Sequence, residues 1–184
     1  MIPLFKSQQK TKSLFSTGFT LLETLVAISI LTLSIAGAFS VAQSGLSAAI
    51  IARDQIIAFH LAQEAIELVR HVRDNNTFNG NTDNFSEGWL IGLNQCFSTD
   101  CAVNIVSKTI TPCGSDCKVY KNNESFYVQN VSDAVSTAFT RKVKLKNVIT
   151  NQEVKISVTM SWRKGSLTKT FVTESHIFNW QKRQ

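Results

Sequence analysis

The feature that most constrains this chain is a long run without any charged residue, from Thr24 to Ala52. Only 17% of the whole chain is charged, against about a quarter in ordinary soluble domains, and the deficit is concentrated in this run. The apolar residues from Phe19 to about Gln43 predict a helix of about 37 Å, enough to cross a hydrocarbon core of about 30 Å. The composition therefore predicts an apolar N-terminal quarter followed by a polar body.

Lysines provide all the charge that precedes the apolar run. Lys6, Lys10 and Lys12 lie before it, and no acid accompanies them. Basic residues that flank a spanning segment mark its cytoplasmic side. We therefore expect a single-pass protein with its N-terminus in the cytoplasm and its body outside, where disulfides persist.

One acid, Glu23, lies near the start of the predicted helix. A carboxylate in a spanning helix costs about 2–3 kcal/mol near the centre and less near an end, so a plain membrane anchor does not account for it. Thr20 and Glu23 have the spacing of a capping box, which would satisfy backbone N–H groups at the helix start. A secretory signal cut after Ala38, in Ala36-Gly37-Ala38, is a further alternative, although the apolar region of a signal is shorter, about 7–15 residues, and uncharged.

The stretch "GFTLLE", Gly18 to Glu23, follows the basic leader and resembles the processing site of type IV prepilins and of the pseudopilins of type II secretion. The resemblance implies that a prepilin peptidase removes residues 1–18 by cutting after Gly18 and methylates Phe19, the new first residue. Glu23 then matches the glutamate at the fifth position of the mature chain. Many major pilins have a proline inside this helix, and its absence here favours a minor pilin or a pseudopilin.

The cut that the resemblance implies gives Glu23 a physical role. It creates a positive α-amino group on Phe19, which can meet the Glu23 carboxylate of a neighbouring subunit within the lipid. In a low dielectric such a pair is strongly favoured over either charge alone. We therefore interpret Glu23 as the residue that sets the register between subunits during assembly.

The resemblance also implies a class of function: a structural subunit that is assembled into, or primes, a type IV pilus or a type II secretion-like filament. The implied partners are a prepilin peptidase, other pilin or pseudopilin subunits, an inner-membrane assembly platform and the lipid bilayer. The implied location is the bacterial cytoplasmic membrane, and then a cell-surface or periplasmic filament. The competing class is an exported binding protein that does not assemble, either anchored by an uncut helix or released as a secreted domain.

The sequence has no motif for catalysis, so we expect neither an enzyme nor a cofactor. It has no Gly-rich phosphate loop, no nucleophile elbow and no H-E-x-x-H. His60 and Glu64 lie one helical turn apart, but a single pair of this kind is usually chance, and we assign no metal to it.

The predicted helix continues beyond the membrane. After Arg53 its apolar residues recur at spacings of three to five, as in an amphipathic helix. The stripe includes Ile50, which precedes Arg53, and then Ile57, Leu61, Ala65, Ile66, Val69 and Val72. Asn75-Asn76 is the predicted stop. One helix is therefore expected over residues 19–74, with residues 19–43 in the membrane or the filament core.

Alternation predicts strands in the exported domain, residues 75–184. The clearest are Arg141–Val148 and Glu153–Trp162, with Leu167–Trp180 as a third. Ala102–Ile110 and Ser125–Gln129 are shorter candidates. Three consecutive antiparallel strands that close onto a long helix predict an α+β fold, which is also the architecture that the resemblance implies. Trp89 and Leu90 are the expected core contacts of the loop region before the strands.

Four cysteines lie close together, as Cys96-x4-Cys101 and Cys113-x3-Cys117. A four-thiolate zinc site uses similar but not identical spacings, and an exported domain favours disulfides over zinc. Three connectivities remain open, and we favour pairing between sequence neighbours. The bridges would hold polar loops that are unable to form a core.

A row of lysines alternates along the first long strand. Lys142, Lys144 and Lys146 are expected on its wet face, opposite Val143 and Leu145. Such a face can contact DNA or another anion by counterion release. The pattern favours solubility and protection of a sheet edge over nucleic-acid binding, because no aromatic residue interleaves with the lysines for base stacking.

Overall fold

The computed structural model describes residues 18, 20–79, 88–114, 116–132 and 134–180. It begins with one helix, α1 (Leu21–Phe78), and continues through two short 3-10 helices, η2 (Gly88–Leu90) and η3 (Asn94–Phe97). The strands that follow are β1 (Cys101–Asn104), β2 (Thr109–Pro112), β3 (Lys118–Lys121), β4 (Tyr127–Val128), β5 (Val135–Ile149), β6 (Glu153–Lys164) and β7 (Leu167–Phe178). This is the predicted α+β layout. The chain divides within α1, between Ala49 and Ile50, into two compact units.

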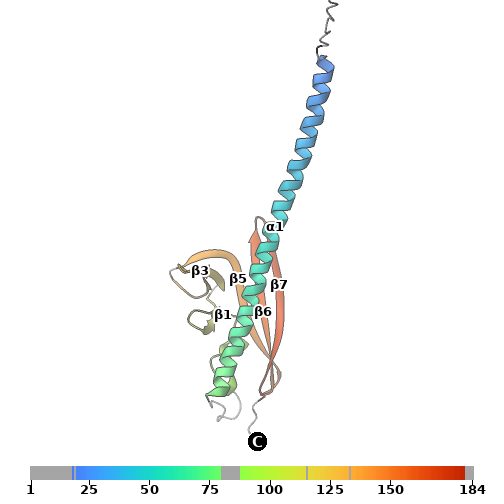
Figure 1. Ribbon diagram of the computed structural model, residues 1–184. Helices are drawn as coiled ribbons and strands as arrows, with labels where there is room; N and C mark the ends of the chain where they lie inside the picture. The colour runs from blue at the N-terminus through green and yellow to red at the C-terminus, as the bar shows by residue number, and fades with distance from the viewer. Residues whose placement is uncertain (1–17, 19, 80–87, 115, 133, 181–184) are drawn as a thin grey trace, which may run out of the picture. The chain divides into compact units, whose positions relative to one another are not determined.

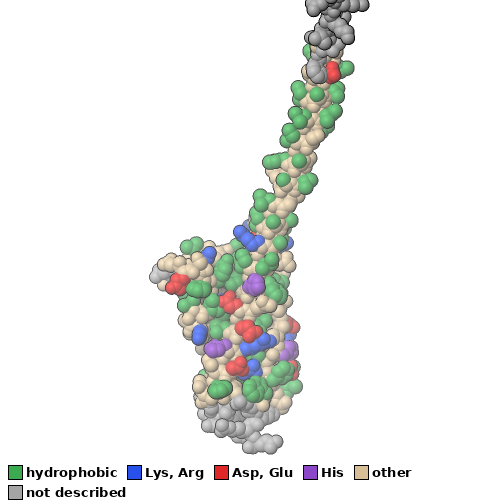
Figure 2. Space-filling model, in the orientation of Figure 1, with side chains coloured by type: hydrophobic (Ala, Val, Ile, Leu, Met, Phe, Trp, Pro, Cys, Tyr) green, Lys and Arg blue, Asp and Glu red, His purple; other side chains and the backbone are tan. Residues whose placement is uncertain are grey.

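The first unit contains the N-terminal part of α1. Its apolar side chains are exposed, from Leu21 at 83% to Leu46 at 66%, and Figure 2 shows hydrophobic side chains spread along this part of the helix. In the described part of the chain, α1 is the helix that is long and apolar enough to cross a membrane. A surface of this kind is stable only where lipid or protein covers it.

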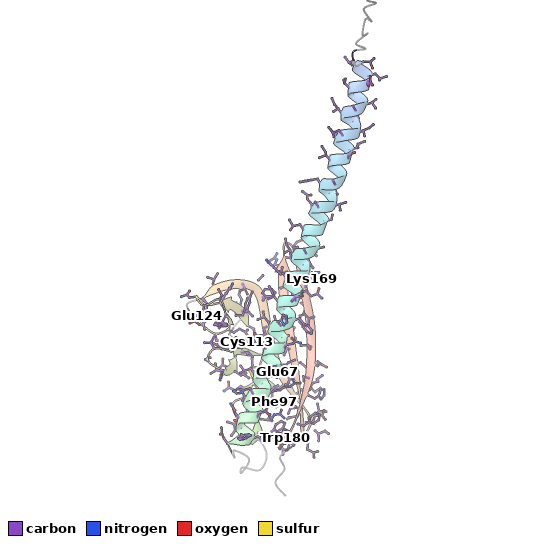
Figure 3. All side chains as sticks on the ribbon, in the orientation of Figure 1. Glu67, Phe97, Cys113, Glu124, Lys169 and Trp180 are labelled. Atoms are coloured by element: carbon purple, nitrogen blue, oxygen red, sulfur yellow. A yellow bond between two sulfur atoms is a disulfide. The ribbon has the colours of Figure 1, made fainter. Side chains whose placement is uncertain are left out.

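The second unit contains an antiparallel sheet. Its strands follow the order β2-β1-β5-β3-β4, and β6 pairs with β5 on one side and with β7 on the other. Figure 1 shows the second half of α1 running along β5, β6 and β7. Glu124, in the β3–β4 turn, lies at the side of the sheet opposite β7 (Figure 3). The long strand β5 therefore pairs with β1, β3 and β6, and each of these carries one outer strand, β2, β4 or β7.

The alternation of the two clearest strands is confirmed. In β5, Val143 and Leu145 are buried while the lysines between them are exposed. In β6 the inward set is fully enclosed and comprises Val154, Ile156, Val158, Met160 and Trp162. The two strands pair in one register from Phe139↔Trp162 to Asn147↔Val154, which keeps both apolar faces on the same side of the sheet.

The second half of α1 covers this apolar face. Its buried residues are Ala58, Leu61, Ala62, Ala65, Ile66, Leu68, Val69 and Thr77, and the apolar ones join the strands, Trp89 and Leu90 in one core cluster. Ile57 and Val72 pack against the same cluster. Polar contacts also hold the helix to β7, because Arg70 Nη2 donates to Ser175 Oγ at 2.8 Å and Arg73 Nη1 donates to the Phe178 carbonyl at 2.9 Å. The predicted stripe from Ile57 to Val72 thus faces the core and is widened by Ala58 and Ala62, whereas Ile50 is not part of the cluster.

The helix does not stop at Asn75-Asn76 as predicted, but continues to Phe78. The Asn76 side chain does not terminate the helix. Its Nδ2 donates to the carbonyls of Trp89 (3.3 Å) and Ile91 (2.8 Å), which fastens the following loop to the helix. Hydrogen bonds to a distant segment replace the local bonds that make asparagine a stop signal.

The short strands also differ from expectation. The stretch 102–110 is not one strand but a hairpin of β1 and β2. Asn104 Oδ1 accepts the N–H groups of Val106 and Ser107, and Lys108 adopts φ 54, so that the chain reverses here. β3 was not predicted, because four residues with an exposed lysine at one end carry little alternation.

Candidate functional site

The start of α1 has the geometry of a capped helix. The Glu23 backbone N–H donates to Thr20 Oγ1 at 3.3 Å, and the Thr24 N–H donates to the Thr20 carbonyl at 3.2 Å. This is the threonine half of the predicted capping box. The Glu23 side chain itself is exposed in the first turn, where the helix dipole favours a negative charge.

The described residues give no steric reason for the glycine before this helix. A Cβ added at Gly18 would meet no described atom within 4 Å. Phe19, the expected first residue of the mature chain, lies outside the described residues. The described residues therefore leave space for a larger side chain at position 18.

Five hydroxyl groups in the apolar part of α1 are satisfied within the helix itself. Each of these donates to a backbone carbonyl three or four residues earlier, at 2.8–3.0 Å, and the donors are Thr24, Ser29, Thr32, Ser34 and Ser44. A carboxylate has no proton to donate in this way. Glu23 is therefore the one side chain between Leu21 and Ala52 whose charge calls for a partner from outside the helix.

The cysteines form two bridges between sequence neighbours, Cys96–Cys101 and Cys113–Cys117. All four sulfurs are used, so the oxidised protein has no thiolate for the zinc site that was the alternative. The first bridge is buried in the core cluster and ties η3 to the start of β1. The second joins Cys113, just after β2, to Cys117, just before β3.

Sequence reasoning missed the most deeply buried charge in the described structure, Arg141. Its side chain is fully enclosed. Nε donates to Gln129 Oε1 (2.9 Å), Nη1 to the Leu61 carbonyl (3.0 Å) and Nη2 to the Val103 carbonyl (2.7 Å). Nη1 also lies 3.5 Å from Glu64 Oε2. One side chain of β5 thus fastens α1, β1 and the residue after β4.

Gln129, also fully buried, completes this network. Its Nε2 donates to the carbonyls of Cys117 (2.6 Å) and Arg141 (2.9 Å), and its Oε1 accepts the Val103 N–H at 3.0 Å. The Cys117 carbonyl accepts the Arg141 N–H as well (3.1 Å). Cys117, one half of the second bridge, is therefore hydrogen-bonded to the middle of the sheet.

A signal for Arg141 was present in the alternation. Residues two apart on a strand face the same way, so Arg141 shares the inward face of Val143 and Leu145. A buried guanidinium needs hydrogen-bond acceptors and a counter-charge, and the sequence does not say where these are. Glu64 supplies the counter-charge, so this residue of the His60/Glu64 pair has a structural role beside Arg141. In the described residues no three His, Cys, Asp or Glu side chains gather as metal ligands.

Burial shifts both members of this ion pair. It lowers the pKa of Arg141 to about 10, against the opposing effect of Glu64, and it raises the pKa of Glu64 above its ordinary value, against the attraction and hydrogen bond of Arg141. Glu64 Oε1 is buried without a hydrogen-bond partner in the described structure. The folded state therefore holds the Glu64 proton more tightly than the unfolded chain does.

A pH dependence of stability follows from this shift. Because the folded state binds more protons at Glu64, the free energy of unfolding falls as pH rises from the ordinary glutamate pKa through the raised one. We expect Glu64→Gln to remove this part of the slope, so that the wild type loses stability relative to the variant between these two pKa values. Urea unfolding of both chains at several pH values measures the difference. A difference that does not change with pH would contradict the assignment.

The three lysines of β5 lie on the wet face of the sheet, as the alternation predicted. Lys142 Nζ pairs with Asp100 Oδ2 at 3.0 Å. Lys144 and Lys146 have no ion pair or hydrogen bond within the part of the chain that the structure describes. Their positive charges are therefore not neutralised by the described residues.

Comparison with known proteins gives one match, at the N-terminus. Residues 16–39 fit the family model of the prokaryotic N-terminal methylation motif. No curated protein and no solved structure is significantly similar to this chain. The match includes Gly18, Phe19 and Glu23, and it ends within the apolar part of α1. The motif is the signature of prepilin-type proteins, the precursors of type IV pilins and pseudopilins.

Proposed function

We propose that this chain, which carries the prepilin-type signature, is a minor pilin or a pseudopilin. A prepilin peptidase cuts it after Gly18 and methylates Phe19. An inner-membrane platform then transfers the N-terminal helix from the lipid into a filament, where it packs against the helices of other subunits. The body, from Ile50 onward, lies outside the cytoplasmic membrane.

The observation that carries the proposal is the motif match at residues 16–39. Three features support it. The described residues give no steric reason for the glycine that precedes the helix, one carboxylate lies in the otherwise uncharged part of α1 from Leu21 to Ala52, and the large apolar side chains from Leu21 to Leu46 are exposed. Exposed apolar surface of this extent requires a lipid or protein partner. A filament core supplies such a partner after the subunit has left the bilayer.

The mass of the mature N-terminus tests the proposal. We expect a chain purified from membranes to begin with N-methyl-phenylalanine at Phe19. A chain that begins at Met1 would instead be an uncut anchor, and one that begins at Phe39 would be a secreted domain. Either result would refute processing as a prepilin.

A matched variant makes the test sharper. Gly18→Val is expected to block the cut while leaving the body folded, because a Cβ at this position meets no described neighbour. The variant should therefore retain residues 1–18 and give the same urea unfolding curve as the wild type. Efficient removal of the leader from this variant would mean that a different enzyme processes the chain.

A further inference from the structure

A cavity of about 400 Å³ lies beside the free lysines of β5. Its lining combines ammonium groups with hydroxyls, and its members are Phe97, Asp100, Lys142, Lys144, Leu145, Lys146, Lys155, Ser157 and Thr159. The cavity is found where β5 loses a neighbour: β1 pairs with β5 at Val143, and in the described residues no strand pairs with β5 on that side beyond it. We propose that this basic groove binds the phosphate backbone of a nucleic-acid strand.

Like charges are direct neighbours in the lining of this groove. Lys146 is directly opposite Lys155 in the β5–β6 register, an arrangement that destabilises a sheet. Lys155 is partly compensated by Glu174, whose Oε1 lies 2.8 Å from its Nζ, and Lys142 by Asp100. Lys144 and Lys146 remain without a described counter-charge. Lysines that serve solubility can be spread over the surface. Lysines that bind an anion must lie close together, as they do around this cavity.

The spacing of the lysines fits a run of phosphates better than a single anion. Residues two apart on a strand are separated by about 6.8 Å, so Lys142 to Lys146 cover about 14 Å. One strand of B-DNA has a phosphate every 3.4 Å or so along the helix axis, and the lysine row therefore spans about four of them. Ser157 and Thr159 lie across from Lys144 and Lys142 and add hydroxyl groups, which commonly donate to phosphate oxygens.

The lining also indicates which part of the nucleic acid the groove contacts. It has no arginine for bidentate recognition of base edges, and its one aromatic residue, Phe97, is partly buried against the core and is not free for base stacking. Binding is thus to the backbone and is independent of base sequence. The inference does not require the chain to be part of a filament.

The test is titration of a fluorescent DNA duplex of mixed sequence with the full chain in a non-ionic detergent, over a range of salt concentrations. Lys144→Gln/Lys146→Gln removes two charges and breaks no described contact. Each lysine that neutralises a phosphate contributes about 0.9 to the slope of log K against log salt concentration. We expect the double variant to lower the slope by about 1.8, which is about a 30-fold loss of affinity at 0.15 M salt. A second duplex with a shuffled sequence should bind equally well.

The matched control is Lys108→Gln/Lys121→Gln, which makes the same change in net charge at exposed lysines outside the groove. We expect less than a threefold loss from it. An equal loss from both double variants would show attraction by net charge alone and overturn the proposal. So would full displacement of DNA by an equal charge concentration of inorganic phosphate, or tighter binding of polyglutamate than of DNA. At equal concentration, DNA should also raise the unfolding midpoint of the wild type more than that of Lys144→Gln/Lys146→Gln.

Discussion

Glu23→Gln will leave the chain cut and inserted but will exclude it from filaments. The substitution keeps the size of the side chain and removes its charge, so the α-amino group of Phe19 in a neighbouring subunit loses its partner inside the lipid. Removal of one member of a buried ion pair costs about 3–5 kcal/mol. A loss of 3 kcal/mol corresponds to more than a 100-fold fall in incorporation. Immunoblots of sheared filaments, normalised to the membrane fraction, measure this ratio.

A cap variant separates this role from helix capping. Thr20→Ala removes the hydroxyl that accepts the Glu23 N–H but keeps the carboxylate. Loss of such a cap costs about 1 kcal/mol and is expected to reduce incorporation by less than tenfold. If Thr20→Ala abolished incorporation as fully as Glu23→Gln did, Glu23 would be important for the helix start rather than for subunit register. Wild-type incorporation of Glu23→Gln would refute the pairing directly.

Arg141→Met will destabilise the body strongly. The variant leaves the Leu61 and Val103 carbonyls, Gln129 Oε1 and the Glu64 carboxylate without their donor. Breaking a buried pair in this way costs about 3–5 kcal/mol, which is a large part of the stability of an ordinary domain. Urea unfolding of the full chain in detergent, followed by the fluorescence of the buried tryptophans, measures the loss.

The neighbouring outward position provides the control. Lys144→Met also replaces a cation of β5 with methionine, but its side chain has no described polar contact, and surface changes of this kind usually stay within about 0.5 kcal/mol. Arg141→Lys keeps the charge but provides one ammonium in place of a planar fork, so we expect a loss between those of the two methionine variants. Equal stability of Arg141→Met and Lys144→Met would mean that the buried network contributes nothing.

The local features of this protein were open to sequence reasoning. A helix with a long uncharged run needs lipid or another helix around it, whatever follows in the chain. The N-terminal methylation motif is a pattern of consecutive residues, so its recognition in the sequence does not depend on folding. Strict alternation over β5 and β6 is an equally local property, and the structure confirms the faces predicted from it.

The buried network and the basic groove depend instead on contacts between distant residues. Arg141 and the Leu61 carbonyl are 80 positions apart, and Lys146 faces Lys155 only through the β5–β6 register. The sequence determined which residues carry charge and which face of each strand they occupy. Only the tertiary structure decided that the Arg141 guanidinium is enclosed while the β5 lysines remain exposed. Enclosure of a charge requires hydrogen-bond acceptors, and α1, β1 and the segment after β4 bring these together from separate parts of the chain.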